Sequence, residues 1–333
     1  MRITIKDIAK RFNVHHSTVS RALKDDPRIK AETRDKIQRY AVENGYQLNI
    51  NALKLRGKVR NSIALIVPNV NHRFFSNIIN HLTNLAYKHN FLLSIYQSNE
   101  NLEMEKSILD KIIQQGIDGV IVSVSDKTKS GNHFLELKKR NIPIVFFDRV
   151  LFDVDASRVT TKNSEVFHLL VNHFVAKNHK RIAHVSGPDH ITVFHDRNLC
   201  YQNAIAAHQL KYKKQIIVMD DFNEKAGEEA AKELFSFEEK PDALISTSFF
   251  LTMGIIKYLN TNNINIPNEV MVAGFGDRLF HSILHSSLIS IEQPEEEMAN
   301  TAFQLLMDLM TALDTGSSDC YKEVVLANTL LCE

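Results

Sequence analysis

The sequence predicts an all-α N-terminal head followed by an α/β body with two parallel β-sheets. The head is predicted by the run TIKDIAKRFNVHHSTVSRAL, residues 4–23, which is typical of two short helices joined by a tight turn. Residues 1–60 hold fifteen Lys and Arg against six Asp and Glu, a net charge of +9, whereas the remaining residues carry −8. The body is predicted by short apolar runs that alternate with amphipathic helices from Ser62 onward. The charge asymmetry indicates a polyanionic partner for the head alone.

The first helix of the head is expected over residues 5–12. Its apolar side chains recur at i, i+3, i+4 and i+7 from Ile5, which places them on one face. Thr4 and Asp7 have the spacing of a capping pair at the helix start. Asn13, which tolerates a left-handed backbone, stands where the chain must reverse.

The second helix is expected over residues 16–23 and presents a polar face suited to a DNA groove. The Asp-Asp-Pro run at residues 25–27 ends it, because proline cannot continue a helix. A third helix is expected over residues 31–44, with Gly45 as its C-cap. Residues 47–58 carry helix-forming side chains over less than two turns, so we expect a linker helix that is only marginally stable alone.

The body alternates predicted strands and helices. The strands are short and apolar, and they cover residues 63–67, 92–96, 119–124, 143–147, 181–185, 216–219, 243–245 and 270–273. The helices between them cover residues 75–90, 101–115, 164–177, 194–208, 224–235, 251–260 and 295–313. So many repeats favour two sheets rather than one, each with helices on both faces. The expected ligand site is the crevice beyond the carboxyl ends of the strands.

Composition excludes several classes of protein. With 333 residues, 44% hydrophobic and 24% charged, the chain has the make-up of a soluble protein of two or three domains. Its apolar stretches are too short to span a membrane, and its first residues lack the apolar core of a signal peptide. Cys200, Cys320 and Cys332 are too few and too scattered for a disulfide or zinc framework. We expect a cytoplasmic bacterial protein with no cofactor and no membrane partner.

Motifs along essentially the whole chain resemble those of the LacI/GalR family of transcriptional repressors. In the head they are TIKDIA, STVSRAL, ETRDKI and ENGY. In the body they are IALIVPNVNHRFFSNII, IPIVFFDRV, HKRIAHVSGP, HDRNLCYQNAI, IPNEVMVAGFGD and SIEQPEEEMANTAFQLLM, in the order and spacing of the family. A chance match to all of them is very improbable.

The resemblance implies a helix-turn-helix head and a body of the periplasmic-binding-protein type I kind, with two Rossmann-like subdomains crossed by three strands. The implied parts are the DNA-binding domain at 1–46, a hinge helix or linker at 47–61, an N-subdomain at 62–161 and 291–318, and a C-subdomain at 162–290 and 319–333. The discontinuity of each subdomain rests on the resemblance alone.

For the head, the resemblance implies two kinds of DNA contact on the second helix, to base edges and to phosphates. His16, Ser17 and Arg21 would reach base edges in the major groove, where an Arg guanidinium binds guanine in a fork. Thr18 and Ser20 would bond phosphates and fix the register of the helix. The alternative for Arg21 is an ordinary solvated charge.

For the hinge, Leu55 aligns with the family's leucine that inserts into the minor groove, and Ala52 and Arg56 flank it. Such an apolar wedge unstacks a base step and kinks the duplex, so the hinge helix would fold only on its operator. The alternative is that Leu53 and Leu55 pack the linker onto the body. Leu48 stands where the family often has proline.

The family also implies a homodimer whose two heads read a pseudo-palindromic, double-stranded operator. The expected dimer surface includes the helices at 75–90 and 101–115 with their counterparts in the C-subdomain. The amphipathic stripes of these helices are equally explained as plain core.

In the cleft, the resemblance places six effector-binding residues: Phe74, Phe75, Asp148, Arg197, Phe222 and Gln293. For each phenylalanine, plain core is the alternative. Three departures from the family pattern add further positions. Ser248 stands in a polar pair that usually ends in Asp, Asp277 keeps only the second carboxylate of a paired element, and Lys162 replaces an Asp.

These departures leave two alternatives open. The effector, a sugar or sugar derivative in this family, could be anionic, such as a sugar phosphate or uronate held by Arg197 and Lys162. Or the cleft has lost sugar binding and answers to another ligand or a protein partner.

Other functions fit the sequence poorly. The string GFGDRL lacks the third glycine of a dinucleotide motif, and no P-loop, GxSxG or HExxH occurs, so no catalytic residues are expected. Adjacent helical residues such as His15 and His16 point apart, so no metal site is expected there. A transport solute-binding protein would lack the basic head. The sequence therefore predicts a DNA-binding transcriptional regulator, a repressor by family habit, with a small-molecule effector.

Overall fold

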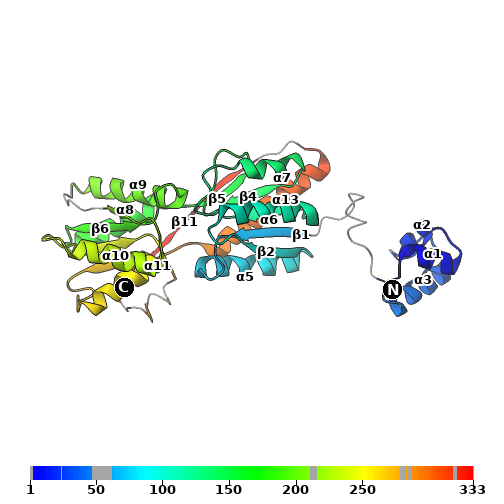
Figure 1. Cartoon of the computed structure of the whole chain (residues 1–333), viewed down its shortest axis with the longest axis horizontal. Coiled ribbons are helices and arrows are strands. Elements are labelled where there is room, and N and C mark those ends of the chain that lie inside the picture. The colour runs from blue at the N-terminus through cyan, green and yellow to red at the C-terminus, as the bar shows by residue number, and fades with distance from the viewer. Residues whose placement is uncertain are drawn as a thin grey trace. The chain divides into compact units, whose positions relative to one another are not determined.

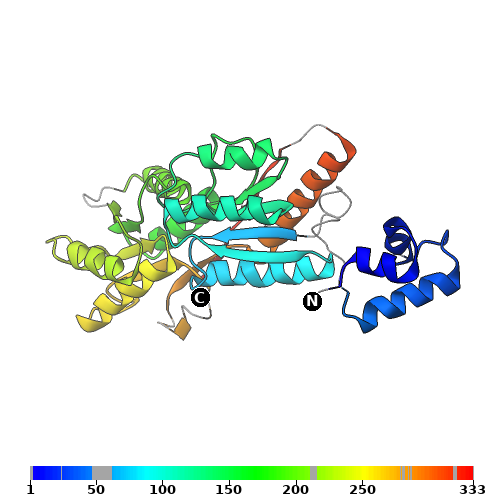
Figure 2. The ribbon, with the colours of Figure 1, turned by 45° about the vertical axis from the view of Figure 1, so that its right-hand side comes forward.

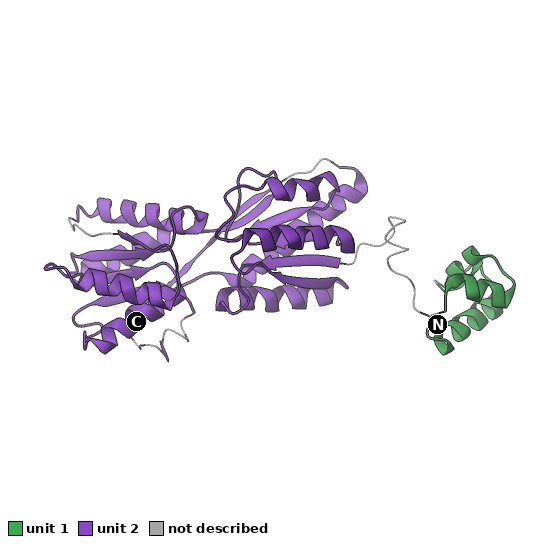
Figure 3. Cartoon of the chain, in the orientation of Figure 1, with its two compact units in different colours: residues 1–60 green, residues 61–333 purple. Residues whose placement is uncertain are grey.

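The chain divides into two compact units, Met1–Arg60 and Asn61–Glu333 (Figure 3). The computed structural model describes residues 3–23, 25–46, 62–210, 216–277, 279, 282–283, 285, 287–317 and 321–332. Within these ranges, no helix has the length and apolar character needed to cross a membrane.

The head is a bundle of three short helices (Figure 1). They are α1 (Ile5–Phe12), α2 (His16–Ala22) and α3 (Ala31–Glu43), within two residues of the predicted bounds. All three contribute to one small apolar core, formed by Ile8, Ala9, Val19, Ala22, Ile37 and Ala41. The helix-turn-helix predicted from the sequence is therefore present.

Local interactions explain where these helices begin and end. The Asp7 amide donates to Thr4 Oγ1 (3.3 Å) and the Thr4 amide donates to Asp7 Oδ2 (2.9 Å), the reciprocal pair of a capping box. Asn13 ends α1 with φ of 49°. The C-cap of α3 is Asn44 rather than the predicted Gly45, which follows with φ of 62° and reverses the chain.

The first sheet of the body has the strand order β11-β5-β4-β3-β1-β2, with every pair parallel. The strands are β1 (Ser62–Val67), β2 (Leu92–Gln97), β3 (Gly119–Val122), β4 (Ile144–Phe147), β5 (Ser157–Lys162) and β11 (Glu323–Ala327). The covering helices are α5 (Arg73–Lys88), α6 (Leu102–Gln115), α7 (Leu135–Lys139), which continues the short 3-10 helix η1 (Asn132–Phe134), and α13 (Glu295–Thr315).

Helices cover both faces of this sheet (Figure 2). Alternate residues of β1 point to opposite faces. Ile63 and Leu65 pack with α5 and α13, whereas Ala64 and Ile66 pack with α6 and α7. The near-continuous apolar run of β1 is therefore the pattern of a central parallel strand buried on both sides.

The second sheet has the order β12-β10-β9-β8-β6-β7, parallel except for β12 against β10. Its strands are β6 (Ile182–Ser186), β7 (Ile216–Val218), β8 (Ala243–Ser246), β9 (Met271–Phe275), β10 (Ile289–Glu292) and β12 (Thr329–Leu331). Its helices are α8 (Ser164–Ala176), α9 (Thr192–Ala207), α10 (Glu224–Phe235) and α11 (Phe249–Thr261). The pair α8 and α9 covers one face, and the pair α10 and α11 covers the other.

Three stretches of chain connect the two sheets, as the resemblance implies. The first follows β5 at Asn163, the second follows β10 at Gln293, and the third joins β11 to β12 through Asn328. All eight predicted strands of the body form, and so do all seven predicted helices.

Two sequence-based assignments in the body need correction. Residues 319–333 were all assigned to the C-subdomain, but β11 pairs with β5 of the first sheet and only β12 joins the second. The boundary at residues 290 and 291 cuts through β10, which pairs with β9 along its length. Strands β5, β10, β11 and β12 and helix α7 were not predicted, because these short segments owe their structure to distant neighbours rather than to a local pattern.

Candidate functional site

The exposed face of α2 carries the residues expected to read DNA. His16 and Arg21 are exposed and Ser17 is half-buried, while Val19 and Ala22 on the opposite side belong to the head core. Arg21 makes no salt bridge with any other described residue of the head. Its guanidinium is therefore available to an external acceptor.

The start of α2 is held by His15. Its Nδ1 accepts a hydrogen bond from the Ser17 amide (3.4 Å) and lies 2.9 Å from Ser17 Oγ. The phosphate-binding candidates Thr18 and Ser20 are half-buried on the same helix. No group of three or more potential metal ligands occurs among the residues that the structure describes.

The hinge candidates Ala52, Leu55 and Arg56 lie outside the described residues, as do residues 47–61 as a whole. Their roles stay predictions.

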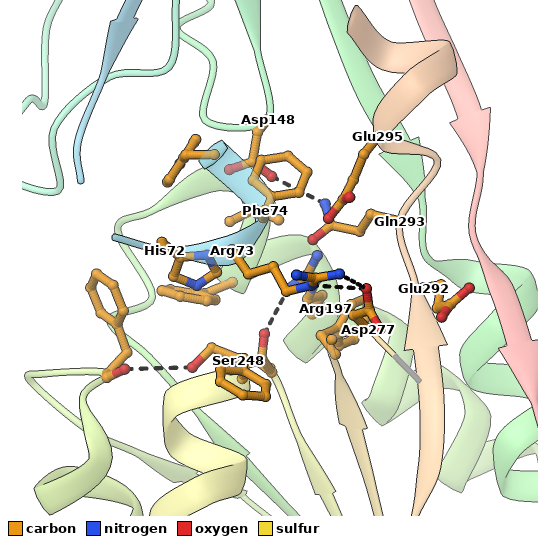
Figure 4. Close-up of a pocket in the computed structure, with 18 of the residues that line it drawn as sticks. His72, Arg73, Phe74, Asp148, Arg197, Ser248, Asp277, Glu292, Gln293 and Glu295 are labelled. Atoms are coloured by element: carbon orange, nitrogen blue, oxygen red, sulfur yellow. Dashed lines mark hydrogen bonds and ion pairs between the residues drawn. The ribbon is translucent and has the colours of Figure 1, made fainter. Parts of the chain in front are cut away.

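The body contains a cavity of about 150 Å³ at the carboxyl ends of strands from both sheets (Figure 4). Asp148 follows β4 of the first sheet, and Thr247, Gly276 and Gln293 follow β8, β9 and β10 of the second. Strands of a parallel sheet end at the same edge, so loops far apart in the sequence meet there. This is the position expected for the effector cleft.

The cavity brings together eight of the nine predicted effector-binding residues: Phe74, Phe75, Asp148, Arg197, Phe222, Ser248, Asp277 and Gln293. Lys162 is absent from this lining, but it lines a neighbouring cavity of about 420 Å³ that shares Asp148 with this one, and its role stays a prediction. Alternation along β5 buries Thr161 and turns Lys162 outward, where its side chain is 58% exposed and lies 3.9 Å from Glu165.

Arg197 is one of three arginines that line the cavity. It is 3% exposed, its Nη1 donates to the carbonyl of Thr247 (2.7 Å), and its Cζ lies 3.4 Å from the ring centroid of Phe275. Its Nε and Nη2 are buried without a partner. Burial lowers the pKa of Arg197 to about 10, so it stays charged at neutral pH.

An ion pair spans the cavity (Figure 4). Arg73, at the start of α5, donates from Nε (2.8 Å) and Nη2 (2.6 Å) to Oδ2 of Asp277, which follows β9. Gln293 donates from Nε2 to Oδ1 of Asp148 at 3.3 Å. Asp148 itself has φ of 57°, a left-handed conformation, at the turn that directs it toward the cavity.

Two further titratable groups border the cavity. Burial, with the nearby charges of Arg149 and Arg197, lowers the pKa of His72 to about 4, so its ring is neutral. Burial also raises the pKa of Glu295 to about 7, against the hydrogen bond that Asn77 donates to it.

Several lining residues were not predicted from the sequence: His72, Arg73, Arg149, Phe194, Phe249, Phe275, Glu292 and Glu295. His72 and Arg73 directly precede the predicted Phe74 and Phe75, so a wider window around that motif would have included them. Arg149, Phe249 and Glu292 likewise adjoin the predicted Asp148, Ser248 and Gln293. The other three lie in α9, β9 and α13, and no local pattern in the sequence marks them.

Comparisons with known proteins agree with this architecture. The sequence profile described as bacterial regulatory proteins, lacI family, matches residues 4–49, and that of the periplasmic binding protein-like domain matches residues 171–323. Catabolite control protein A of Priestia megaterium is 27% identical over 321 residues, which cover 96% of each chain. The HTH-type transcriptional repressor CytR of Escherichia coli (strain K12) is 26% identical over 94% of this chain and 92% of its own.

Among solved structures, that of the lac repressor dimer bound to operator and the anti-inducer ONPF matches with a TM-score of 0.81 and 19% identity, covering 99% of this chain and 98% of the other. This likeness supports the fold. The relatives matched by sequence are regulators of transcription and not enzymes.

Proposed function

We propose that this chain, whose residues 4–49 match the lacI family of bacterial regulatory proteins, is a repressor of that family that binds a pseudo-palindromic operator as a homodimer and responds to a small anionic effector. The observation that carries the effector part is the buried guanidinium of Arg197, whose Nε and Nη2 have no protein partner. Since bacterial DNA lies in the cytoplasm, we place the protein there.

For DNA binding, the proposal rests on the exposed polar face of α2 within a basic head. His16, Ser17 and Arg21 would contact base edges, and Thr18 and Ser20 would contact phosphates. Selection from a random DNA library with the full-length protein tests this assignment. We expect a selected site with two-fold sequence symmetry, whereas a site without symmetry would contradict dimeric recognition.

For dimerisation, the proposal rests on an apolar surface around the edge strand β2. Leu92 of β2 is 67% exposed and Tyr87 at the end of α5 is 85% exposed, with Ile95 and Met104 exposed nearby in sequence. An unpaired edge strand with apolar side chains is a surface that natural proteins cover. Sedimentation of the Leu92→Glu variant is expected to show monomers, and a dimer of unchanged stability would contradict this surface.

For the effector, Arg197 offers the fixed fork with which guanidinium groups bind carboxylates or phosphates. Sugar acids and sugar phosphates are the anions that the family resemblance suggests. Lys162, which lines the neighbouring cavity rather than this one, stays a separate prediction. Thermal-shift screening against neutral sugars, sugar phosphates, uronates and nucleobases tests the charge of the effector, and stabilisation by neutral sugars alone would contradict it.

A second candidate is regulation without a ligand in this cavity. The observation in its favour is that Arg73 and Asp277 satisfy each other across the cavity. In that case no small molecule would change operator affinity, and a partner protein would do so instead.

A further inference from the structure

The polar side chains around the cavity are for the most part already paired with protein atoms. The pairs are Arg73 with Asp277, Gln293 with Asp148, Glu295 with Asn77, and Ser248 with the carbonyl of Phe222 and the amide of Leu251. A buried pyranose presents four or five hydroxyl groups, and each needs a partner to offset its lost hydration. Accommodating such a ring would require breaking several of these pairs.

The unmet hydrogen-bonding capacity of the lining is small. Among buried lining atoms that the structure describes, those without a partner are Nε and Nη2 of Arg197 and Nδ1 of His72. Nε and Nη2 form one edge of the guanidinium and together match a carboxylate. In this cavity, Nε and Nη2 of Arg73 donate to Oδ2 of Asp277 at 2.8 and 2.6 Å. His72, being neutral, adds one acceptor or donor, depending on its tautomer.

The remaining surface is aromatic. Six phenylalanines border the cavity: Phe74, Phe75, Phe194, Phe222, Phe249 and Phe275. Their edge-to-face contacts, such as Phe74 with Phe75 at 5.1 Å and Phe194 with Phe222 at 5.2 Å, suit the insertion of another flat ring. A volume of about 150 Å³ is enough to take a single six-membered ring.

From these observations we propose that the effector is a small aromatic carboxylate with one ring, bound through its carboxylate to Arg197, with a ring hydroxyl meeting His72. This inference deepens the proposed function, because it concerns the same cavity and the same anion-binding group.

The charges around the cavity favour a monoanion over a phosphate dianion. Three arginines (Arg73, Arg149 and Arg197) face four carboxylates (Asp148, Asp277, Glu292 and Glu295). Arg73 and Arg149 are already engaged by Asp277 and Glu100. The charges of Asp148 and Asp196 act on Arg197, the one lining arginine outside these two ion pairs. The lining therefore carries an excess of carboxylates, which repels a dianion more strongly than a monoanion.

The test is calorimetric titration and thermal shift of the full-length protein with defined probes. The aromatic probes are benzoate, the three hydroxybenzoate isomers and the neutral analogue benzamide. The other probes are glucuronate, galacturonate, glucose and inorganic phosphate. We expect at least one hydroxybenzoate to raise the melting temperature and benzamide to bind at least tenfold more weakly.

Two variants assign the contacts. Arg197→Lys keeps the charge but loses the fork, and we expect a tenfold or larger loss of hydroxybenzoate affinity. His72→Phe keeps the ring shape, and we expect the preference for hydroxybenzoate over benzoate to disappear. Lys225→Gln, which removes an exposed cation of α10 outside the lining, is the matched control and should bind as the parent protein does. Should Arg197→Lys fail to fold, the His72→Phe comparison and the benzamide comparison still decide the question.

The outcomes separate this inference from the proposed function. Binding of uronates without binding of aromatic acids would overturn the aromatic ring and keep the anionic effector. Binding of glucose alone would overturn both. No binding by any aromatic acid would overturn the inference, whatever the operator experiments show.

Discussion

The guanidinium of Arg73 donates from Nε and Nη2 to a single oxygen, Oδ2 of Asp277, at 2.8 and 2.6 Å. Arg73 begins α5, which packs on the first sheet, and Asp277 follows β9 of the second sheet. This ion pair is therefore a direct link between the two halves of the body at the cavity. The strength of the ion pair between Arg73 and Asp277 therefore affects the free energy needed to separate the two halves of the body.

We expect this link to contribute modestly to stability. Both side chains are partly exposed, at 36% and 24%, so solvent screens their attraction. A double-mutant cycle with Arg73→Met and Asp277→Asn should give a coupling energy of about 0.5–1 kcal/mol in urea unfolding. The coupling should shrink in high salt, and a salt-independent value would argue against an electrostatic link.

Glu295 should make stability depend on pH near neutrality. Burial raises its pKa from 4.5 to about 7 in the folded protein, with Asp277 and Glu292 adding to the rise and Arg73 opposing it. The folded state thus holds the proton more tightly than the unfolded state does. The stability associated with protonated Glu295 is fully present below about pH 4.5 and is lost as pH rises through about 7.

Glu295→Gln removes this titration and keeps an amide that can bond Asn77. Relative to the parent, the variant should gain roughly 2 kcal/mol at pH 8, less than the full shift implies because the group is partly solvated. The difference should vanish at pH 4.5. Urea unfolding at several pH values measures it, and parallel pH profiles for the two proteins would contradict the assignment.

Arg21→Ala should weaken operator binding by about 1–3 kcal/mol, the range for loss of a forked contact to guanine, and relax the base preference at one position of each half-site. Arg39→Ala, which removes an exposed cation from α3, is the matched control and should weaken binding to all sequences alike. Titration of selected and scrambled DNA with each variant distinguishes the two effects. Equal losses on both DNAs for Arg21→Ala would make Arg21 a phosphate contact.

Leu55→Ala should largely abolish operator binding and leave the head folded. The reason is that an alanine is too short to unstack a base step and hold the kink. Leu53→Ala is the matched control, since the wedge is assigned to Leu55. Gel-shift assays with the selected operator measure binding, and circular dichroism verifies the head. If the Leu55→Ala variant bound the operator with unchanged affinity, Leu55 would not be the residue that inserts between the bases.

Local sequence patterns predicted much of the fold because the signals concerned are themselves local. The capping box of Thr4 and Asp7 and the turn at Asn13 depend on residues within one helical turn. The strands β1, β3, β4 and β8 are buried along their length, so their apolar runs are unambiguous. In contrast, β5 has the polar sequence SRVTTK, and only its pairing with β4 and β11 makes it a strand.

The cavity residues likewise divide into those that the sequence predicted and those that it missed. Sequence motifs and their family resemblance indicated Arg197, Asp148 and Gln293 as cleft residues, and the structure brings them together. Lys162 lines the neighbouring cavity instead, because its direction depends on the alternation of β5, a strand that the sequence did not reveal. Arg149, which follows β4, and Glu295, which begins α13, were missed because distant packing decides that each reaches the cavity.

The amino-acid sequence by itself determined that this protein has a basic helix-turn-helix head and an α/β body, because charge, capping and hydrophobic periodicity act over a few residues. Only the tertiary structure decided which side chains meet in the cavity and which of them remain unpaired. Arg73 pairs with Asp277 because segments from both sheets meet at the cavity. The same packing leaves Nε and Nη2 of Arg197 without a hydrogen-bond partner. Such convergence follows from the packing of the whole body, and no segment of the chain encodes it alone.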